Sequence, residues 1–300
     1  MDAAPLPVIV NRGGGTAATL GAKLSDTLHE AFAAAGLTIE LELAEGEQCD
    51  AALKRVAGAP VVVVGGGDGT IGHAAGPLAA SGSALGILPL GTRNHLARQL
   101  GIPAALPDAA SVIAEGVRIR IDLARAGQRV FVNNASIGIY TRLVRLRDVH
   151  RGPKWLATIP ASLSVLRHWR AQPLTLEIDG ATRHVRTPLL FIGNNRYSLA
   201  GGEVGARESL SKGVLSLYAV AARTPWQLIT VAARVLVGRS DVERDFGAIA
   251  EARHLTVAGE NPLRVAFDGE VERMESPLEF TILPGVLEVV VPSGDGTKAT

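Results

Sequence analysis

The stretch VVVVGGGDGTIGHAA at residues 61–75 carries the strongest local signal in this sequence. Its valine run is continuous and β-branched, which is typical of a strand buried on both faces of a parallel sheet. Three glycines, Asp68, Gly69 and Thr70 follow, and the residues after them have helical character. A helix that begins directly after such a loop presents free backbone amides, which attract anions. The context therefore favours a phosphate-binding loop over an ordinary glycine-rich turn.

Strand-like and helix-like patterns alternate on both sides of this stretch. Leu20, Leu24, Leu28 and Phe32 recur at a spacing of four, which indicates an amphipathic helix. The alternation predicts an α/β domain with a mostly parallel sheet over residues 1–122. The strand-like runs are 7–10, 37–43, 60–64 and 84–90, and the helix-like stretches are 20–32, 48–57 and 70–80.

After residue 122 the pattern changes to short strands at close spacing. Residues 174–186 are typical of a hairpin, with Asp179-Gly180 at its turn. We therefore expect a β-rich domain over residues 123–292. Helices are expected near 155–170 and 225–237, and a mobile tail at 293–300.

The composition limits the class of protein. The chain has 300 residues, of which 47% are hydrophobic and 20% charged, so we expect a packed globular protein. Lys and Arg number 30 against 29 Asp and Glu, a balance that disfavours a wholly basic nucleic-acid-binding protein. The single cysteine, Cys49, excludes a disulfide framework within the chain and a cysteine-based zinc site.

No targeting or membrane-spanning segment is expected. The stretch MDAAPLPVIVNRGGG lacks a basic segment followed by a long apolar run, so the sequence predicts no signal peptide. No window holds about 18 uninterrupted apolar residues, the length that a spanning helix needs. We expect a cytoplasmic protein, and the sequence leaves self-association open.

Two further glycine-rich loops have the same form as the first. VIVNRGGGT at 8–16 and LGILPLGTRNHLARQLGIP at 85–103 each lead from a strand-like run through glycine to a helix-like stretch. In open α/β sheets, ligands bind at the carboxyl ends of parallel strands, so these loops would complete a nucleotide site. For Thr92 and Asn94, capping of the following helix explains the residue types as well as ligand contact does.

Other nucleotide-binding motifs fit less well. GDGTIG at 67–72 matches the dinucleotide pattern, which requires an acidic residue about 20 positions later. No acidic residue occurs between Asp68 and Asp108. The Gly-Lys pair of a Walker A loop is absent, and a second GDGT at 294–297 has no helix after it.

Three segments together resemble the diacylglycerol kinase catalytic family, which includes bacterial lipid kinases and is related to sphingosine and ceramide kinases. They are GGGDGT at 65–70, PLGTRNHLAR at 89–98 and FDGE at 267–270. GGDGT alone is shared with NAD kinases and phosphofructokinases, whereas PLGT-x-N with a late DGE is more specific. The resemblance covers nearly the whole chain. It implies an NAD kinase-like α/β domain, a β-sandwich-like C-terminal domain and an active site in the cleft between them.

The resemblance also implies ATP and Mg²⁺ as cofactors, and a hydroxyl of diacylglycerol or a similar long-chain lipid as the phosphate acceptor. It implies Glu270 as general base with Asp268 beside it, and Asp68 as the carboxylate on the metal side. Without the resemblance, Asp268-Gly269 is typical of a plain hairpin turn. The residues implied for the nucleotide are Asn11, Arg12, Gly13, Gly14, Gly15, Gly66, Gly67, Asp68, Gly69, Thr70, Thr92 and Asn94.

The chain departs from the family pattern in the first loop, which reads NRGGG where a Pro and a Ser are common, and at three single positions. Gly72 and His95 stand where Asn and Asp are common, and Lys212 stands where some members have an Asp that binds a structural Mg²⁺. Because a lysine cannot bind the ion, we predict that this structural metal site is absent. The departures keep two alternatives open: a kinase with a soluble acceptor such as NAD, and a nucleotide- or lipid-binding regulator with little turnover.

A basic segment indicates contact with a membrane surface. Residues 142–170 combine several arginines and a lysine with Trp155 and Trp169. Basic and tryptophan side chains together suit an anionic lipid surface. A solvated helix face explains the same residues equally well.

Overall fold

The computed structural model describes residues 4–13, 15–138, 171–197, 207, 209–222, 224, 226–227, 230, 234 and 246–294. The chain divides into two compact units, residues 1–123 with 284–300 and residues 124–283. The predicted basic segment at 142–170, most of the predicted helix near 225–237 and the end of the predicted tail lie outside the described residues. Of the helices that are described, none has the length and apolar character needed to cross a membrane.

The first unit is built on a parallel sheet. Its strands β1 (Leu6–Asn11), β2 (Ile39–Ala44), β3 (Val61–Gly66) and β4 (Ala84–Pro89) lie in the order β2-β1-β3-β4. The valines of β3 from Val62 to Val64 are buried, as expected for a strand covered on both faces. The predicted mostly parallel sheet is confirmed.

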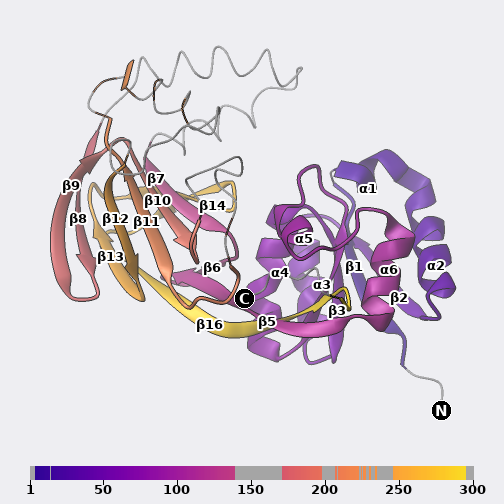
Figure 1. Ribbon diagram of the computed structural model, residues 1–300. Helices are drawn as coiled ribbons and strands as arrows, with labels where there is room; N and C mark the ends of the chain where they lie inside the picture. Colours follow the sequence, from indigo (N-terminus) through magenta and orange to yellow (C-terminus); the bar gives the residue numbers. More distant parts are fainter. Residues whose placement is uncertain are drawn as a thin grey trace. The chain divides into compact units, whose positions relative to one another are not determined.

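Helices cover both faces of this sheet. Figure 1 shows α2 (Leu24–Ala34) and α6 (Leu106–Glu115) on one side, and α3 (Glu47–Arg55) and α4 (Asp68–Ser81) on the other. The side chains at the predicted spacing on α2 are buried, and Gly82 ends α4 in the left-handed conformation with a φ of 71°. The short elements α1 (Gly15–Leu20), the 3₁₀ turn Gly21–Lys23 and α5 (His95–Gln99) follow glycine-rich loops.

The second unit contains a six-stranded antiparallel sheet in the order β12-β11-β10-β7-β14-β15. Two of its strands, β14 and β15, form a hairpin joined by Asp268 and Gly269. The strands are β7 (Asn134–Gly138), β10 (Leu189–Asn194), β11 (Leu215–Val220), β12 (Phe246–Ala252), β14 (Leu263–Phe267) and β15 (Glu270–Met274).

A second antiparallel layer belongs to the same unit. It contains the hairpin of β8 (Gln172–Ile178) and β9 (Ala181–Thr187), with the predicted Asp179-Gly180 turn between them. β13 (His254–Ala258) pairs with β8 on one side and with the first residues of β16 (Leu278–Val291) on the other. The short strand β6 (Arg129–Phe131) pairs with the end of β5 (Val117–Ala126).

The two layers of the second unit share one hydrophobic core. Phe131 from β6, Phe267 from β14 and Phe280 from β16 are fully buried in it. The ring centroid of Phe131 lies 5.7 Å from that of Phe267 and 6.4 Å from that of Phe280, distances typical of packed aromatic pairs. Side chains from both sheets therefore interdigitate, and the predicted β-rich, sandwich-like architecture is confirmed.

Two strands pass from one unit into the other. The division falls after Leu123 on β5 and before Pro284 on β16. The sequence predicts a second domain that extends to residue 292. In the structure, residues from Pro284 onward belong to the first unit, because the end of β16 pairs with β4 at Val289 and Leu85. Within the first unit the buried Asp122 accepts a hydrogen bond from the backbone amide of Gly285 at 2.7 Å.

Candidate functional site

The three glycine-rich loops leave the carboxyl ends of three adjacent strands of the first unit. Val10 of β1 is in register with Gly65 of β3, and Gly66 of β3 with Pro89 of β4. Because parallel strands end at the same edge of a sheet, the loops that follow β1, β3 and β4 lie side by side. The sequence predicted this grouping from the alternation of strands and helices.

The loops approach each other more closely than side chains would allow. A Cβ atom on Gly91 would lie 2.3 Å from the Cα of Gly67, and one on Gly15 would lie 2.2 Å from the carbonyl oxygen of Leu90. Gly15 also has a φ of 62°, which favours glycine. Glycine at these positions is therefore required for packing between loops, a role that the sequence did not reveal.

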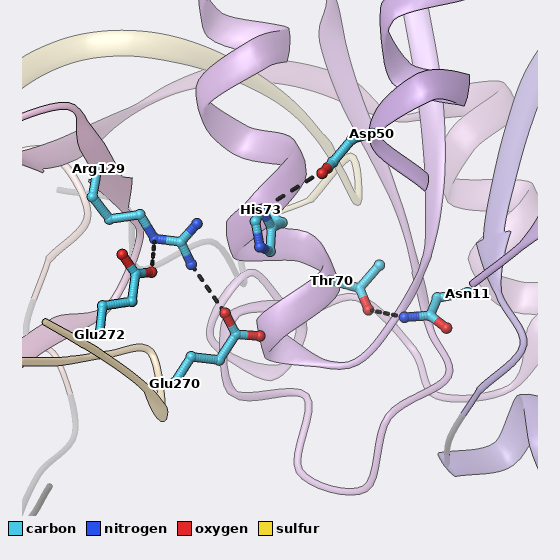
Figure 2. Close-up of polar contacts among 7 residues, drawn as sticks. All are labelled: Asn11, Asp50, Thr70, His73, Arg129, Glu270 and Glu272. Carbon is cyan, nitrogen blue, oxygen red and sulfur yellow. Dashed lines mark hydrogen bonds and ion pairs between the residues drawn. The ribbon is translucent and has the colours of Figure 1, made fainter. Parts of the chain in front are cut away.

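Side-chain hydrogen bonds connect the first loop to the second. The Asn11 amide donates to the hydroxyl of Thr70 at 3.0 Å, as Figure 2 shows, and its carbonyl oxygen accepts from the backbone amide of Gly13 at 3.0 Å. Both predicted nucleotide residues thus hold the loops in place. Arg12 forms an exposed ion pair with Glu45 at 2.9 Å, and Gly14 lies outside the described residues.

Asn94 fixes the third loop. Its carbonyl oxygen accepts from the amide of Gly91 at 2.9 Å, and its Nδ2 donates to the carbonyl oxygens of Pro89 at 3.0 Å and Gly91 at 2.9 Å. Its side chain makes no capping bond to α5, so the helix-cap explanation is wrong for this residue. Thr92 in the same loop is exposed.

Asp68 stands at the start of α4, beside the free amides of that helix. Its Oδ1 accepts from the backbone amide of Leu96 at 3.2 Å, which ties the second loop to α5. Magnesium is commonly held by one or two carboxylates together with substrate phosphates and water. Among the described residues, no three His, Cys, Asp or Glu side chains gather as a metal cluster. A single carboxylate beside a helix start, where backbone amides favour phosphate, therefore fits magnesium held largely by a nucleotide.

Unlike Asp68, the histidines near these loops do not stand at the start of the helix that follows the second loop. Figure 2 shows the side chain of His73 on α4 facing that of Asp50 on α3. Nδ1 of His73 lies 4.0 Å from Oδ1 of Asp50, and both side chains are about half exposed. His95 at the start of α5 is exposed. Neither histidine is placed with further metal-binding groups among the residues that the structure describes.

In the second unit, the FDGE segment forms the tight turn of the β14–β15 hairpin. Asp268 and Gly269 both have positive φ, 47° and 97°, as a two-residue hairpin turn of this kind requires. The Asp268 carboxylate accepts three backbone amides, from Val132 at 2.9 Å, Asn133 at 2.8 Å and Asn134 at 3.1 Å. The turn is therefore fastened to the segment between β6 and β7.

The surroundings of Asp268 change its acidity. Burial raises the pKa of this carboxyl group above its ordinary value, and the three backbone hydrogen bonds together with Arg207 offset part of that rise. Arg207 is itself buried, and its Nη1 donates to the carbonyl oxygen of Val132 at 2.6 Å. Asp268 thus belongs to a polar cluster that was not predicted from sequence.

Glu270 begins β15 and is exposed at the end of the hairpin. Its Oε2 accepts a hydrogen bond from Nη2 of Arg129 at 3.0 Å, and Nε of Arg129 lies 3.1 Å from Oε1 of Glu272 (Figure 2). Arg129 was missed as a site residue. The only signal in the sequence is the position of Arg129 just before the VFVNN stretch that precedes β7.

Comparison with known proteins identifies both halves of the chain. The family described as "Diacylglycerol kinase catalytic domain" matches residues 5–126. The family described as "YegS C-terminal NAD kinase beta sandwich-like domain" matches residues 135–291. The chain belongs to the family of this second domain, which covers more than half of its residues. The resemblance inferred from GGGDGT, PLGTRNHLAR and FDGE is confirmed.

Curated relatives of the chain include proteins that are named as lipid kinases. "Lipid kinase YegS" of Escherichia coli (strain K12) is 34% identical over 198 residues, which cover 61% of this chain and 64% of that protein. "Probable lipid kinase YegS-like" of Klebsiella pneumoniae (strain 342) is 36% identical over 166 residues, covering 52% and 54%. The chain thus spans between half and two thirds of the length of these relatives.

A solved structure shares the fold of this chain. The crystal structure described as that of a diacylglycerol kinase from Bacillus anthracis str. Sterne matches with a TM-score of 0.69. The match covers 96% of each chain at 20% sequence identity, so it supports the fold alone.

Proposed function

We propose that this protein is a lipid kinase that transfers the γ-phosphate of ATP to a hydroxyl of diacylglycerol or a similar long-chain lipid. The observation that carries the proposal is the set of three glycine-rich loops at the ends of β1, β3 and β4, beside the start of α4. The match of residues 5–126 to the diacylglycerol kinase catalytic domain supports it.

The first unit would bind the nucleotide. Free amides at the start of α4 favour the negatively charged phosphates, and the packing of Gly67 against Gly91 keeps side chains away from this backbone. Asp68 is the residue that would hold Mg²⁺. When bound, the ion supplies positive charge to the phosphate oxygens.

The second unit would supply the base. We propose that Glu270 accepts the proton of the lipid hydroxyl while that oxygen forms a bond to the γ-phosphorus. The bond between this phosphorus and the bridging oxygen breaks at the same time, so the products are ADP and a lipid phosphate. Because Asp268 is occupied by three backbone amides, Glu270 is the better candidate for the proton acceptor.

The test is phosphate transfer from γ-labelled ATP to a mixed lipid extract. We compare wild type with Glu270→Gln, and use Glu275→Gln as the matched control. Glu275 is exposed just beyond β15 and has no hydrogen bond or ion pair with the residues that are described. A positioned base contributes about 10²–10⁴-fold, so we expect a loss of that size in Glu270→Gln and no loss in Glu275→Gln.

Three results would contradict the proposal. Labelling of NAD or another soluble metabolite in place of lipid would establish the soluble-acceptor kinase. Nucleotide binding without any transfer would support a regulator. Equal activity of wild type and Glu270→Gln would remove Glu270 from the role of base.

We also propose that the protein works in the cytoplasm and contacts anionic membranes peripherally through the basic segment at 142–170. The support is the combination of basic and tryptophan residues in its sequence. Co-sedimentation with vesicles of anionic and of neutral phospholipid, at low and high salt, tests it. We expect binding to anionic vesicles that weakens with salt, and salt-insensitive binding would contradict the electrostatic explanation.

A further inference from the structure

Arg129 connects two glutamates on the same face of β15. Its guanidinium group donates to Glu270 through Nη2 and is paired with Glu272 through Nε, at 3.0 and 3.1 Å. The two glutamates are two positions apart on a strand, so their side chains point to the same face of the sheet. One planar cation therefore spans both carboxylates.

This contact is better shielded than an ordinary surface ion pair. The Arg129 side chain is 19% exposed, whereas those of Glu270 and Glu272 are 49% and 37% exposed. Ion pairs between fully exposed side chains contribute little, because water and salt screen them and the side chains lose freedom. A largely buried guanidinium held by one carboxylate has few orientations left, so it can restrict the second carboxylate.

The backbone that carries Arg129 is itself fastened to the hairpin. Three residues after Arg129, the amides of Val132, Asn133 and Asn134 begin their hydrogen bonds to Asp268. The amide of Asp268 in turn donates to the carbonyl oxygen of Asn134 at 3.0 Å. The segment 129–134 thus holds the β14–β15 turn through its backbone and the first glutamate after the turn through a side chain.

We infer that Arg129 is the positioning residue for Glu270, and that Glu272 anchors Arg129 in this role. The inference rests on the proposed function, in which Glu270 accepts the proton of the lipid hydroxyl. The guanidinium group fixes the direction in which the Glu270 carboxylate faces its substrate. Without it, the Glu270 carboxylate loses this restraint on its direction, and proton transfer depends on orientation.

The experiment measures lipid phosphorylation by wild type, Arg129→Ala, Arg129→Lys and Glu272→Gln. Arg273→Ala is the matched control, since Arg273 is an exposed arginine on the same strand with no ion pair among the described residues. We expect kcat to fall by about 10- to 100-fold in Arg129→Ala, with the KM for ATP unchanged. Arg129→Lys and Glu272→Gln should show smaller losses, because each keeps part of the arrangement.

Two readouts separate positioning from a general structural role. In the Glu270→Gln background, replacing Arg129 with Ala should cause no further loss, because the group that it positions is already gone. Added guanidinium ion, below denaturing concentration, should restore part of the activity of Arg129→Ala, while potassium chloride at equal ionic strength should not. Thermal unfolding of each variant checks that the fold is kept. Glu272→Gln removes the charge that anchors Arg129 while Arg129 itself stays in place.

The outcomes distinguish this inference from the proposed function. Lipid phosphorylation by wild type that is lost in Glu270→Gln but unchanged in Arg129→Ala overturns the inference alone. Increased activity in Arg129→Ala also overturns it, since the ion pair would then restrain Glu270. Additive losses in the double variant would assign Arg129 a role independent of Glu270. Absence of phosphate transfer by wild type overturns the proposed function and this inference together.

Discussion

The carboxylate of Asp268 accepts a hydrogen bond from the backbone amide of Asn133 at 2.8 Å. The other Asp-Gly hairpin of the second unit is built in the same way, because Asp179 accepts the amides of Arg253 at 3.1 Å and His254 at 2.9 Å. In both hairpins, the aspartate of the turn fastens it to a distant segment of backbone. This likeness assigns Asp268 a structural role that does not depend on chemistry at Glu270.

Replacing Asp268 by asparagine should destabilise the protein. The amide side chain offers one oxygen in place of the two that now accept three amides, and its NH₂ group would face backbone donors. We expect the free energy of unfolding to fall by about 2–4 kcal/mol, measured by urea denaturation. Asp179→Asn, at a more exposed turn, should cost about 1 kcal/mol. A stability of Asp268→Asn equal to that of wild type would contradict the structural role.

The pH dependence of stability should carry a signature of Asp268. Burial raises the pKa of this group above its ordinary value of 3.8, so the folded state holds the proton more tightly than the unfolded chain. Its contribution to stability is therefore fully present below pH 3.8 and is lost as the pH rises through the folded-state pKa. We expect the stability of wild type relative to Asp268→Asn to decrease as the pH rises above about 4. An increase over the same range would show that the three amides hold the carboxylate ionised.

Asn94 provides a test of the third loop in the absence of nucleotide. Asn94→Ala removes three hydrogen bonds to the backbone of 89–91 and places alanine at a φ of 49°. We expect a loss of about 2–4 kcal/mol in unfolding free energy. Glycine adopts this φ without strain, so Asn94→Gly measures the loss of the hydrogen bonds alone. Unchanged stability of both variants, with weaker nucleotide binding, would favour direct ligand contact by Asn94.

Gly91→Ala should disrupt the packing between the second and third loops. The new methyl group would lie 2.3 Å from the Cα of Gly67, and backbone cannot move aside as a flexible side chain can. We expect a loss of about 1–3 kcal/mol and weaker ATP binding, measured by thermal unfolding and calorimetry. Gly294→Ala, where the added methyl would meet open space, is the control. Full ATP affinity in Gly91→Ala would show that the close approach of the loops is dispensable.

The elements of the first unit follow from local sequence patterns. The valine run of β3 and the four-residue spacing of Leu24, Leu28 and Phe32 identify a buried strand and an amphipathic helix from neighbouring residues alone. Strand alternation then places the three glycine-rich loops at one edge of the sheet, as the structure has them. The Asp179-Gly180 and Asp268-Gly269 turns are equally local, since two residues decide each hairpin.

The roles of individual side chains in the loops were less predictable. The sequence predicts that Asn94 caps α5 or contacts a ligand. Its side chain does not cap α5 and bonds to the turn before that helix. The sequence assigns no packing role to Gly91, which makes room for Gly67. Each role depends on the path of a neighbouring loop, which periodicity does not describe.

The sequence by itself determined the α/β unit, the β-rich unit, the three loops and the family, because periodicity and short motifs are properties of adjacent residues. Only the tertiary structure decided which polar groups meet. Asp268 and Val132 are 136 positions apart, and Arg129 and Glu270 are 141 apart. Such pairs form because packing of the β-sandwich brings these segments together, and the bonds to Asp268 satisfy a carboxylate that burial would otherwise leave unpaired.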